Sequence, residues 1–167
     1  MKLPHLDDWE LSPENAHPVC RQLLSEHWYW DAIEEWSPFG NDTGADTLFF
    51  YSQRVHETPG LRGIEFVDHL LEGWQMNPHW EAETDGDVRA VLESEPYGIQ
   101  TGNDAAVATA FGQVLLFGAV EDDVRRLALR AIQRSRLPAL LALGGFPEVR
   151  IEHLGIMSRD LQRAPSR

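Results

Sequence analysis

Clustered carboxylates are the feature of this sequence with the clearest chemical potential. Asp42 and Asp46 are four residues apart, so in a helix they share one face of the first turn. Asp31 and Glu35 precede them across a Pro-Phe-Gly turn. Carboxylate oxygens are the ligands that Mg²⁺ and Ca²⁺ prefer. One hypothesis is therefore a metal-dependent hydrolase or lyase that uses Asp31, Asp42 and Asp46, with His56 beside them.

Helix capping explains the same acids without a metal. Asn and Asp side chains accept hydrogen bonds from the free amides of a first helical turn, which stabilises the helix start by about 0.5–2 kcal/mol. The spacing also lacks the alternating oxygen ligands of a calcium-binding loop. Capping is the preferred interpretation of Asn41 and Asp42, and we expect no metal or other cofactor.

Common patterns of catalytic residues do not occur in the sequence. The seven histidines form no His-Glu-x-x-His pair, and there is no Gly-x-Ser-x-Gly, phosphate-binding loop or dinucleotide fingerprint. A general base needs a partner within hydrogen-bond reach, and no spacing here supplies one. The sequence thus predicts no catalytic residue and favours a non-enzymatic protein.

Three of the six tryptophans, Trp28, Trp30 and Trp36, lie among these acids. Such clusters usually pack into a core, and where they stay exposed they mark protein interfaces. An acidic, aromatic surface suits a basic or amphipathic protein partner. The candidate surface residues are Trp30, Asp31, Glu35, Phe39, Asn41, Asp42 and Asp46, together with Asn103 and Asp104 from a second, similar segment.

The elements that position these residues follow from a repeated tripeptide. Gly40-Asn41-Asp42 and Gly102-Asn103-Asp104 each precede an apolar run with helical spacing, so each predicts a helix start. The first helix should stop at Thr58-Pro59-Gly60. The second should run from about Asp104 to Phe117, and it is apolar on every side, which predicts a central position. Duplication and convergence on good caps both explain the repeat.

Hydrophobic spacing predicts further helices over about 18–28, 64–74 and 88–92, another from about 122, and a short apolar turn from Pro138. Residues 80–84 form an edge strand or none, and 149–152 form a strand or a docking segment. The fold class is mainly α with at most a few short strands: a compact helical domain with two related Gly-Asn-Asp turn-helix units. Residues 1–167 are expected to form a single domain, with a frayed tail at about 163–167.

Charge and composition restrict the partners. The formal net charge is −13, and residues 1–104 carry 21 acids against 5 bases, whereas residues 105–167 carry 6 acids against 9 bases. The excess of negative charge repels phosphate backbones and disfavours binding of nucleic acid. Arg126, Arg130 and Arg134 are expected to form an outer stripe that could pair with acids of a second copy in a homodimer. The sequence lacks an apolar run of about 18 residues and an N-terminal signal segment, and it has a single cysteine, Cys20, so we expect a cytoplasmic protein without membrane contact.

A family signature is visible around the first copy of the repeat. It comprises Tyr29-Trp30-Asp31, Glu35 and the run Ser37-Pro38-Phe39-Gly40-Asn41-Asp42-Thr43-Gly44-Ala45-Asp46-Thr47-Leu48. This run resembles the YfeS-like family of small uncharacterised bacterial proteins, and it is also similar to a second bacterial group with Gly-Pro-Phe-Asp-Asn-Asp before its first helix. Neither group has a known reaction to carry over. The resemblance implies a small intracellular bacterial protein. The leading hypothesis is a non-enzymatic protein-binding or regulatory module, with the metal-dependent enzyme and the homodimer as alternatives.

Overall fold

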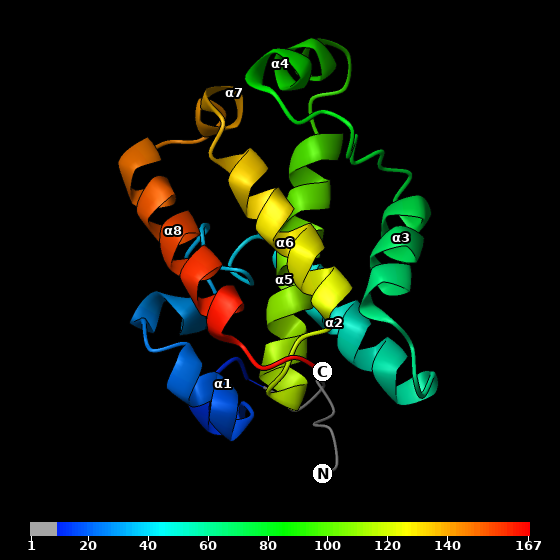
Figure 1. The fold of residues 1–167 in the computed structure, drawn as a ribbon, viewed down its shortest axis with the longest axis vertical. Helices are drawn as coiled ribbons and strands as arrows, with labels where there is room; N and C mark the ends of the chain where they lie inside the picture. Colours follow the sequence, from blue (N-terminus) through cyan, green and yellow to red (C-terminus); the bar gives the residue numbers. More distant parts are fainter. Residues whose placement is uncertain (1–9) are drawn as a thin grey trace.

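The computed structural model describes residues 10–167, and about two thirds of this part of the chain is helical, with turns and loops between the helices (Figure 1). Residues 1–9 lie outside the described residues. The N-terminal stretch in which no signal segment was recognised falls within them. The prediction of a mainly α fold is confirmed. The helices are α1 (Pro18–Leu23), α2 (Asp42–Glu57), α3 (Gly63–Gly73), α4 (Asp85–Ser94), α5 (Gly98–Phe117), α6 (Asp122–Ser135), α7 (Pro138–Leu141) and α8 (Pro147–Arg163), with 3-10 turns at Pro13–Asn15 and His27–Trp30.

Helix α5 forms the centre of the molecule, as its apolar sequence predicts. It packs against α6, α2, α3 and α1, and sixteen of its twenty residues are buried. Alanines at 105, 106, 108 and 110 are fully buried along it, and such small side chains let neighbouring helices approach closely. Figure 1 shows α5 running the length of the molecule behind α6, with α8 and α3 on opposite sides. The long apolar helix thus provides the frame for every other element.

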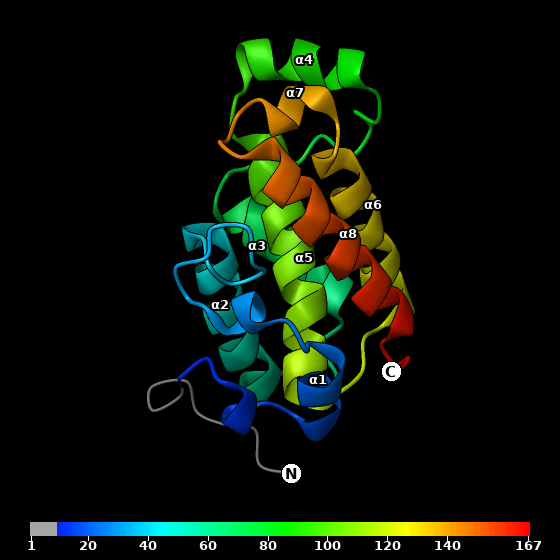
Figure 2. The same ribbon diagram turned by 90° about the vertical axis from the view of Figure 1, so that its left-hand side faces the viewer.

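Helices α4 and α7 pack together at one end of this frame (Figure 2). They have a small core of their own, which includes Val88, Ile99 and Leu140. Helix α4 begins with a capping box, because the Thr84 hydroxyl accepts from the Asp87 amide while the Asp87 carboxylate accepts from the Thr84 amide. The predicted short helix at 88–92 is therefore confirmed and is longer at both ends.

The second Gly-Asn-Asp does not start a helix, so the prediction of two related turn-helix units is wrong. Helix α5 begins at Gly98, and Gly102 lies inside it. A Cβ atom at Gly102 would stand 2.4 Å from the Cβ of Pro78, and one at Gly98 would stand 2.1 Å from the Asn77 carbonyl oxygen. These glycines let α5 pass close to the segment that precedes α4. Tertiary packing, rather than a turn, requires them.

Other segments also differ from their prediction. Helix α1 ends at Leu23 instead of about residue 28, and residues 149–152 lie within α8. Residues 80–84, for which an edge strand or none was predicted, form no strand. The expected fraying of residues 164–167 is replaced by docking. The Val120 amide donates to the Pro165 carbonyl, the Arg167 amide donates to the Val120 carbonyl, and both distances are within 3.0 Å. Backbone pairing therefore holds the end of the chain against the start of α6.

Candidate functional site

The turn before α2 is a helix cap, as predicted. Asn41 is the N-cap residue, and its Oδ1 accepts from the Gly44 amide at 2.8 Å while its Nδ2 donates to the Glu35 carbonyl at 3.2 Å. Phe39 is buried beneath the turn. A Cβ atom at Gly44 would stand 2.1 Å from the Pro38 carbonyl oxygen, so the backbone of the turn lies directly on the helix. Residues 35–41, which we call the signature loop, are thereby held in place.

The acids of the metal hypothesis do not assemble into a site. The Asp31 carboxylate accepts from the Ile33 amide at 3.0 Å, whereas Asp42 and Asp46 lie exposed on the first turns of α2. Within residues 10–167, no group of three or more His, Cys, Asp or Glu side chains is placed to hold a metal ion. The alternative hypothesis, in which Asp31, Asp42 and Asp46 act together as metal ligands, therefore finds no such group among the described residues.

A small cavity, which we call the loop cavity, lies where the signature loop meets α5 and α8. Its volume is about 50 Å³, and its charged lining residues are Glu35, Asp104 and Arg150. Burial raises the pKa of Asp104 to about 7, although the positive charge of Arg150 opposes this effect. The sequence singled out Glu35 and Asp104 but missed Arg150, because nothing local distinguishes one arginine of an amphipathic helix from another.

The Arg150 guanidinium is buried yet only partly bonded. Its Nη1 donates to the Leu140 carbonyl at 3.0 Å, and its Cζ stands 4.6 Å from the centre of the Trp36 ring. Among residues 10–167 the guanidinium has no second acceptor, and no oxygen of Asp104 comes within 4.0 Å of it. Asp104 itself receives no hydrogen bond from the described part of the chain. The loop cavity therefore holds a fixed cation and a carboxylate that do not touch.

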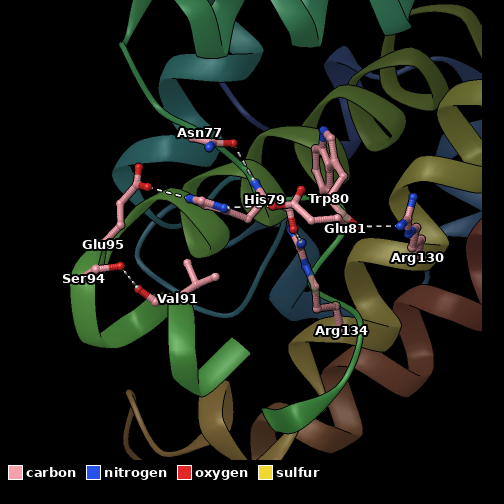
Figure 3. A network of polar contacts seen from close by, with 9 residues as sticks. All are labelled: Asn77, His79, Trp80, Glu81, Val91, Ser94, Glu95, Arg130 and Arg134. Carbon is pink, nitrogen blue, oxygen red and sulfur yellow. Dashed lines mark hydrogen bonds and ion pairs between the residues drawn. The ribbon is translucent and has the colours of Figure 1, made fainter. Parts of the chain in front are cut away.

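The other member of the second tripeptide, Asn103, is a buried crosslink between helices. Its Oδ1 accepts from the Nε and Nη2 of Arg134 at 2.9 and 2.6 Å, and its Nδ2 donates to the Ser135 hydroxyl at 3.0 Å. Arg134 also donates from Nη1 to the His79 carbonyl at 2.7 Å and stacks on Trp80 at 4.7 Å. Figure 3 shows Arg134 directed toward this segment. The role of Asn103 is thus structural, and its predicted role as a cap is wrong.

His79 extends this network to α4 (Figure 3). Its Nδ1 lies 3.1 Å from Glu81 and its Nε2 lies 2.5 Å from Glu95. The hydrogen bond to Glu95 is the main reason that the pKa of His79 is raised. His79 has a positive φ of 47°, a backbone conformation in which non-glycine residues are uncommon. The network therefore fixes an unusual turn between α3 and α4.

The predicted outer stripe of arginines is not a free surface. Arg134 is buried, and Arg130 forms an ion pair with Glu83 of the same chain. Only Arg126 of the three is exposed without a hydrogen bond or ion pair to residues 10–167. Arg130 and Arg134 thus have partners inside the molecule, so the three arginines do not form the exposed stripe that was predicted, and the homodimer itself stays a prediction.

An apolar groove lies between α2 and α3, at some distance in the sequence from the tryptophans that were expected to form a binding surface. It has a volume of about 440 Å³, and its lining includes the apolar side chains of Phe50, Phe66, Leu70 and Trp74 together with Arg54. Phe50 remains 38% exposed and meets Trp74 edge to face, with 6.4 Å between ring centres. We call this feature the α2/α3 groove. The sequence signal for it was Phe50 itself, an aromatic residue outside the buried face of α2.

The tryptophans near the signature loop are mainly packing residues. Trp28 stacks between Tyr29 and His153, with ring centres 4.0 and 4.1 Å away. The Trp30 indole donates to the Leu24 carbonyl at 3.1 Å, and the Trp36 ring stacks against the guanidinium of Arg150. Each ring has a separate partner, so these residues form no continuous aromatic surface.

These features define the class of protein: a helical domain with a small charged cavity and an apolar groove. The resemblance to the YfeS-like family is confirmed: the chain is 30% identical over 145 residues to a protein of Escherichia coli (strain K12), Uncharacterized protein YfeS. The aligned residues make up 84% of this chain and 59% of that protein, so the chain spans about three fifths of its relative. No family model and no solved structure matches the chain. Across residues 10–167, no helix combines the length and apolar character needed to cross a bilayer.

Proposed function

We propose that this protein is a non-enzymatic, protein-binding module of the bacterial cytoplasm and that its α2/α3 groove takes a basic amphipathic helix of a partner. The observation that carries the proposal is the open apolar groove itself, about 440 Å³ in volume, with the exposed aromatic ring of Phe50 beside Trp74. Apolar grooves between helices bind partner helices through side chains at i, i+3, i+4 and i+7. The buried, single cysteine Cys20, whose pKa burial raises to about 12, suits a reducing compartment.

Aromatic side chains give the groove the composition of a binding surface. Phe and Trp contribute a large contact area with few rotatable bonds, so they lose little entropy when a partner orders them. Phe66 and Leu70 form the floor, and both belong to the core cluster under α3 or pack against it. A firm floor beneath exposed rings is the arrangement in which truncation of a single aromatic residue costs the most affinity.

Charge selects the kind of partner. Residues 42–74, which form the two helices beside the groove, contain six acids and two arginines. Glu65, Asp68 and Glu72 are exposed on α3. These acids lie beside the groove and not in it, since Asp68 and Glu72 line a separate hollow and the groove itself is lined by Arg54 and His69 and by no acid. They would attract a basic helix to this side of the molecule through the long-range field. A second copy of the chain would bring the same acidic face, so repulsion disfavours self-association through the groove.

A model helix tests the proposal directly. We would titrate the full chain with an 18-residue leucine–lysine helix that has one apolar face, and with a leucine–glutamate helix of the same pattern, by isothermal titration calorimetry. We expect binding of the lysine helix only, with weaker binding at high salt. Phe50→Ser should weaken it about tenfold, equivalent to about 1.4 kcal/mol. The matched control is Tyr97→Ser, because Tyr97 is another exposed aromatic residue, at 71%, outside the groove.

Two results would overturn the proposal. The first is equal affinity of the wild type and Phe50→Ser, which would place binding outside the groove. The second is equal binding of the basic and acidic helices, which would show that apolar contact alone determines the interaction. Sedimentation equilibrium at low salt completes the test, since a dimer that Phe50→Ser dissolves would identify a second copy as the occupant.

A further inference from the structure

We propose that the loop cavity binds the zwitterionic head group of a small α-amino acid, with the carboxylate on Arg150 and the ammonium group on Asp104. This goes beyond the proposed function, because the loop cavity and the α2/α3 groove share no lining residue. It would give the protein a small-molecule ligand in addition to a protein partner.

Arg150 is a preorganised anion receptor. Its relative exposure is 5%, and the Trp36 ring and the Leu140 carbonyl hold the guanidinium in one orientation. After the bond to Leu140, the guanidinium has N–H groups that find no acceptor among residues 10–167. None of these N–H groups is among the fully buried atoms without a partner, so they are accessible from the loop cavity and free to donate to a bound anion. Arginine meets a carboxylate in a planar, two-bond geometry that suits this remaining capacity.

Asp104 supplies the complementary end of the site. Its carboxylate lines the same cavity and receives no hydrogen bond from residues 10–167. Glu35 adds a second negative charge from the signature loop. Arg150 is the counter-charge that faces Asp104 from α8, yet the two side chains do not come within 4.0 Å. A ligand with an anionic and a cationic end separated by a short link would satisfy both residues.

The size of the cavity limits the ligand. A volume of about 50 Å³ holds roughly three to five water-sized groups, since one such position needs about 10–15 Å³. This fits an amino and a carboxylate group on one carbon. Val107, Leu154 and Met157 form an apolar wall, so only a very small side chain has room. Glycine, with five non-hydrogen atoms, is the ligand that fits this volume and charge pattern best.

The test is a titration of the ¹⁵N-labelled full chain with glycine, followed by NMR. Acetate and methylammonium, each at the same concentration, serve as half-ligands. We expect glycine to shift the amide signals of residues around the loop cavity more than either half-ligand does, and to bind at least tenfold more weakly to Asp104→Asn and to Arg150→Lys. Asp42→Asn is the matched control, because Asp42 belongs to the same signature but is exposed and does not line the cavity.

The pH dependence adds a second readout. Because burial raises the pKa of Asp104 to about 7, the ionised form that an ammonium group needs increases between pH 6 and pH 8. Affinity for glycine should rise over that interval and should stay flat in Asp104→Asn. Absence of cavity shifts, binding of acetate as strong as that of glycine, or unchanged affinity in a folded Asp104→Asn would each overturn the proposal.

The groove proposal stands apart from these results. Phe50→Ser should leave glycine binding unchanged, and Asp104→Asn should leave binding of the leucine–lysine helix unchanged. Should Arg150→Lys prove unfolded, Asp104→Asn still decides the outcome, because Asp104 makes no hydrogen bond with residues 10–167 that the change would remove.

Discussion

Alanine substitutions at Asn41 and Asn103 compare two residues that share one place in the repeated tripeptide but have different roles in the structure. If both were caps, the two changes would cost the same. Asn41→Ala removes the acceptor of the Gly44 amide at an accessible helix start, and loss of such a cap costs about 1 kcal/mol. Asn103→Ala removes the acceptor of two Arg134 N–H groups and leaves a buried guanidinium partly unpaired. Loss of a buried hydrogen-bond acceptor of a charged group costs about 1.5–3 kcal/mol.

Thermal and urea unfolding measure this difference. For a domain of this size, 1 kcal/mol shifts the melting temperature by about 2–4 °C, so Asn41→Ala should melt about 2–4 °C lower and Asn103→Ala roughly 3–12 °C lower. Asn103→Asp is the control, because it keeps an acceptor for Arg134 and loses only the donor to Ser135; it should recover most of the loss. Equal destabilisation by the two alanines, or no recovery by aspartate, would refute the assigned role of Asn103.

Three further substitutions test separate features. His79→Asn should reduce stability more at pH 6 than at pH 9 in urea unfolding. Nearby carboxylates raise the pKa of His79 above 6.5 in the folded state, so its stabilising contribution is complete below pH 6.5 and is lost as the pH rises through the folded-state pKa. Equal losses of stability at the two pH values would contradict this. Gly44→Ala should destabilise by at least about 1–3 kcal/mol, because its Cβ would meet the Pro38 carbonyl oxygen at 2.1 Å; wild-type melting would disprove the close approach. Gly155→Ala, inside α8 with nothing within 4 Å of the new Cβ, should instead raise stability by about 0.5–1 kcal/mol, and a lower melting temperature would count against an open position.

Local patterns allowed most of the helices to be predicted. Helix α2 carries both its apolar face and its stop signal, Thr58-Pro59-Gly60, in a short stretch of chain, and the apolar face of α3 was clear from periodicity. The prediction from local patterns failed at residues 149–152. Val149 and Ile151 favour a strand over a short window, whereas the whole segment forms α8. Helix formation over seventeen residues and docking on the core outweighed the local preference.

Predicting an outer arginine stripe failed because of helix geometry. Residues four apart advance by about 400° at 3.6 residues per turn, so each step of four rotates the side chain by about 40°. From Arg126 to Arg134 the rotation is about 80°, which carries the last arginine from the exposed face to the boundary with α5. A spacing of four alone does not keep three residues on one face over two turns.

The polar residues of the two tripeptides have different roles because each side chain hydrogen-bonds to whichever neighbouring groups lack another partner. At Asn41 the unpaired groups are the amides of a helix start, which sequence can locate, so the cap was predictable. At Asn103 they are the N–H groups of an arginine thirty-one residues away, and at Asp104 the nearest cation comes from α8. The Asn103 pairing is already complete, so it supports the fold. Asp104 and Arg150, by contrast, keep hydrogen-bonding groups without partners in the described chain. These unpaired groups are the reason that we propose a ligand for the loop cavity and not for the Asn103 network.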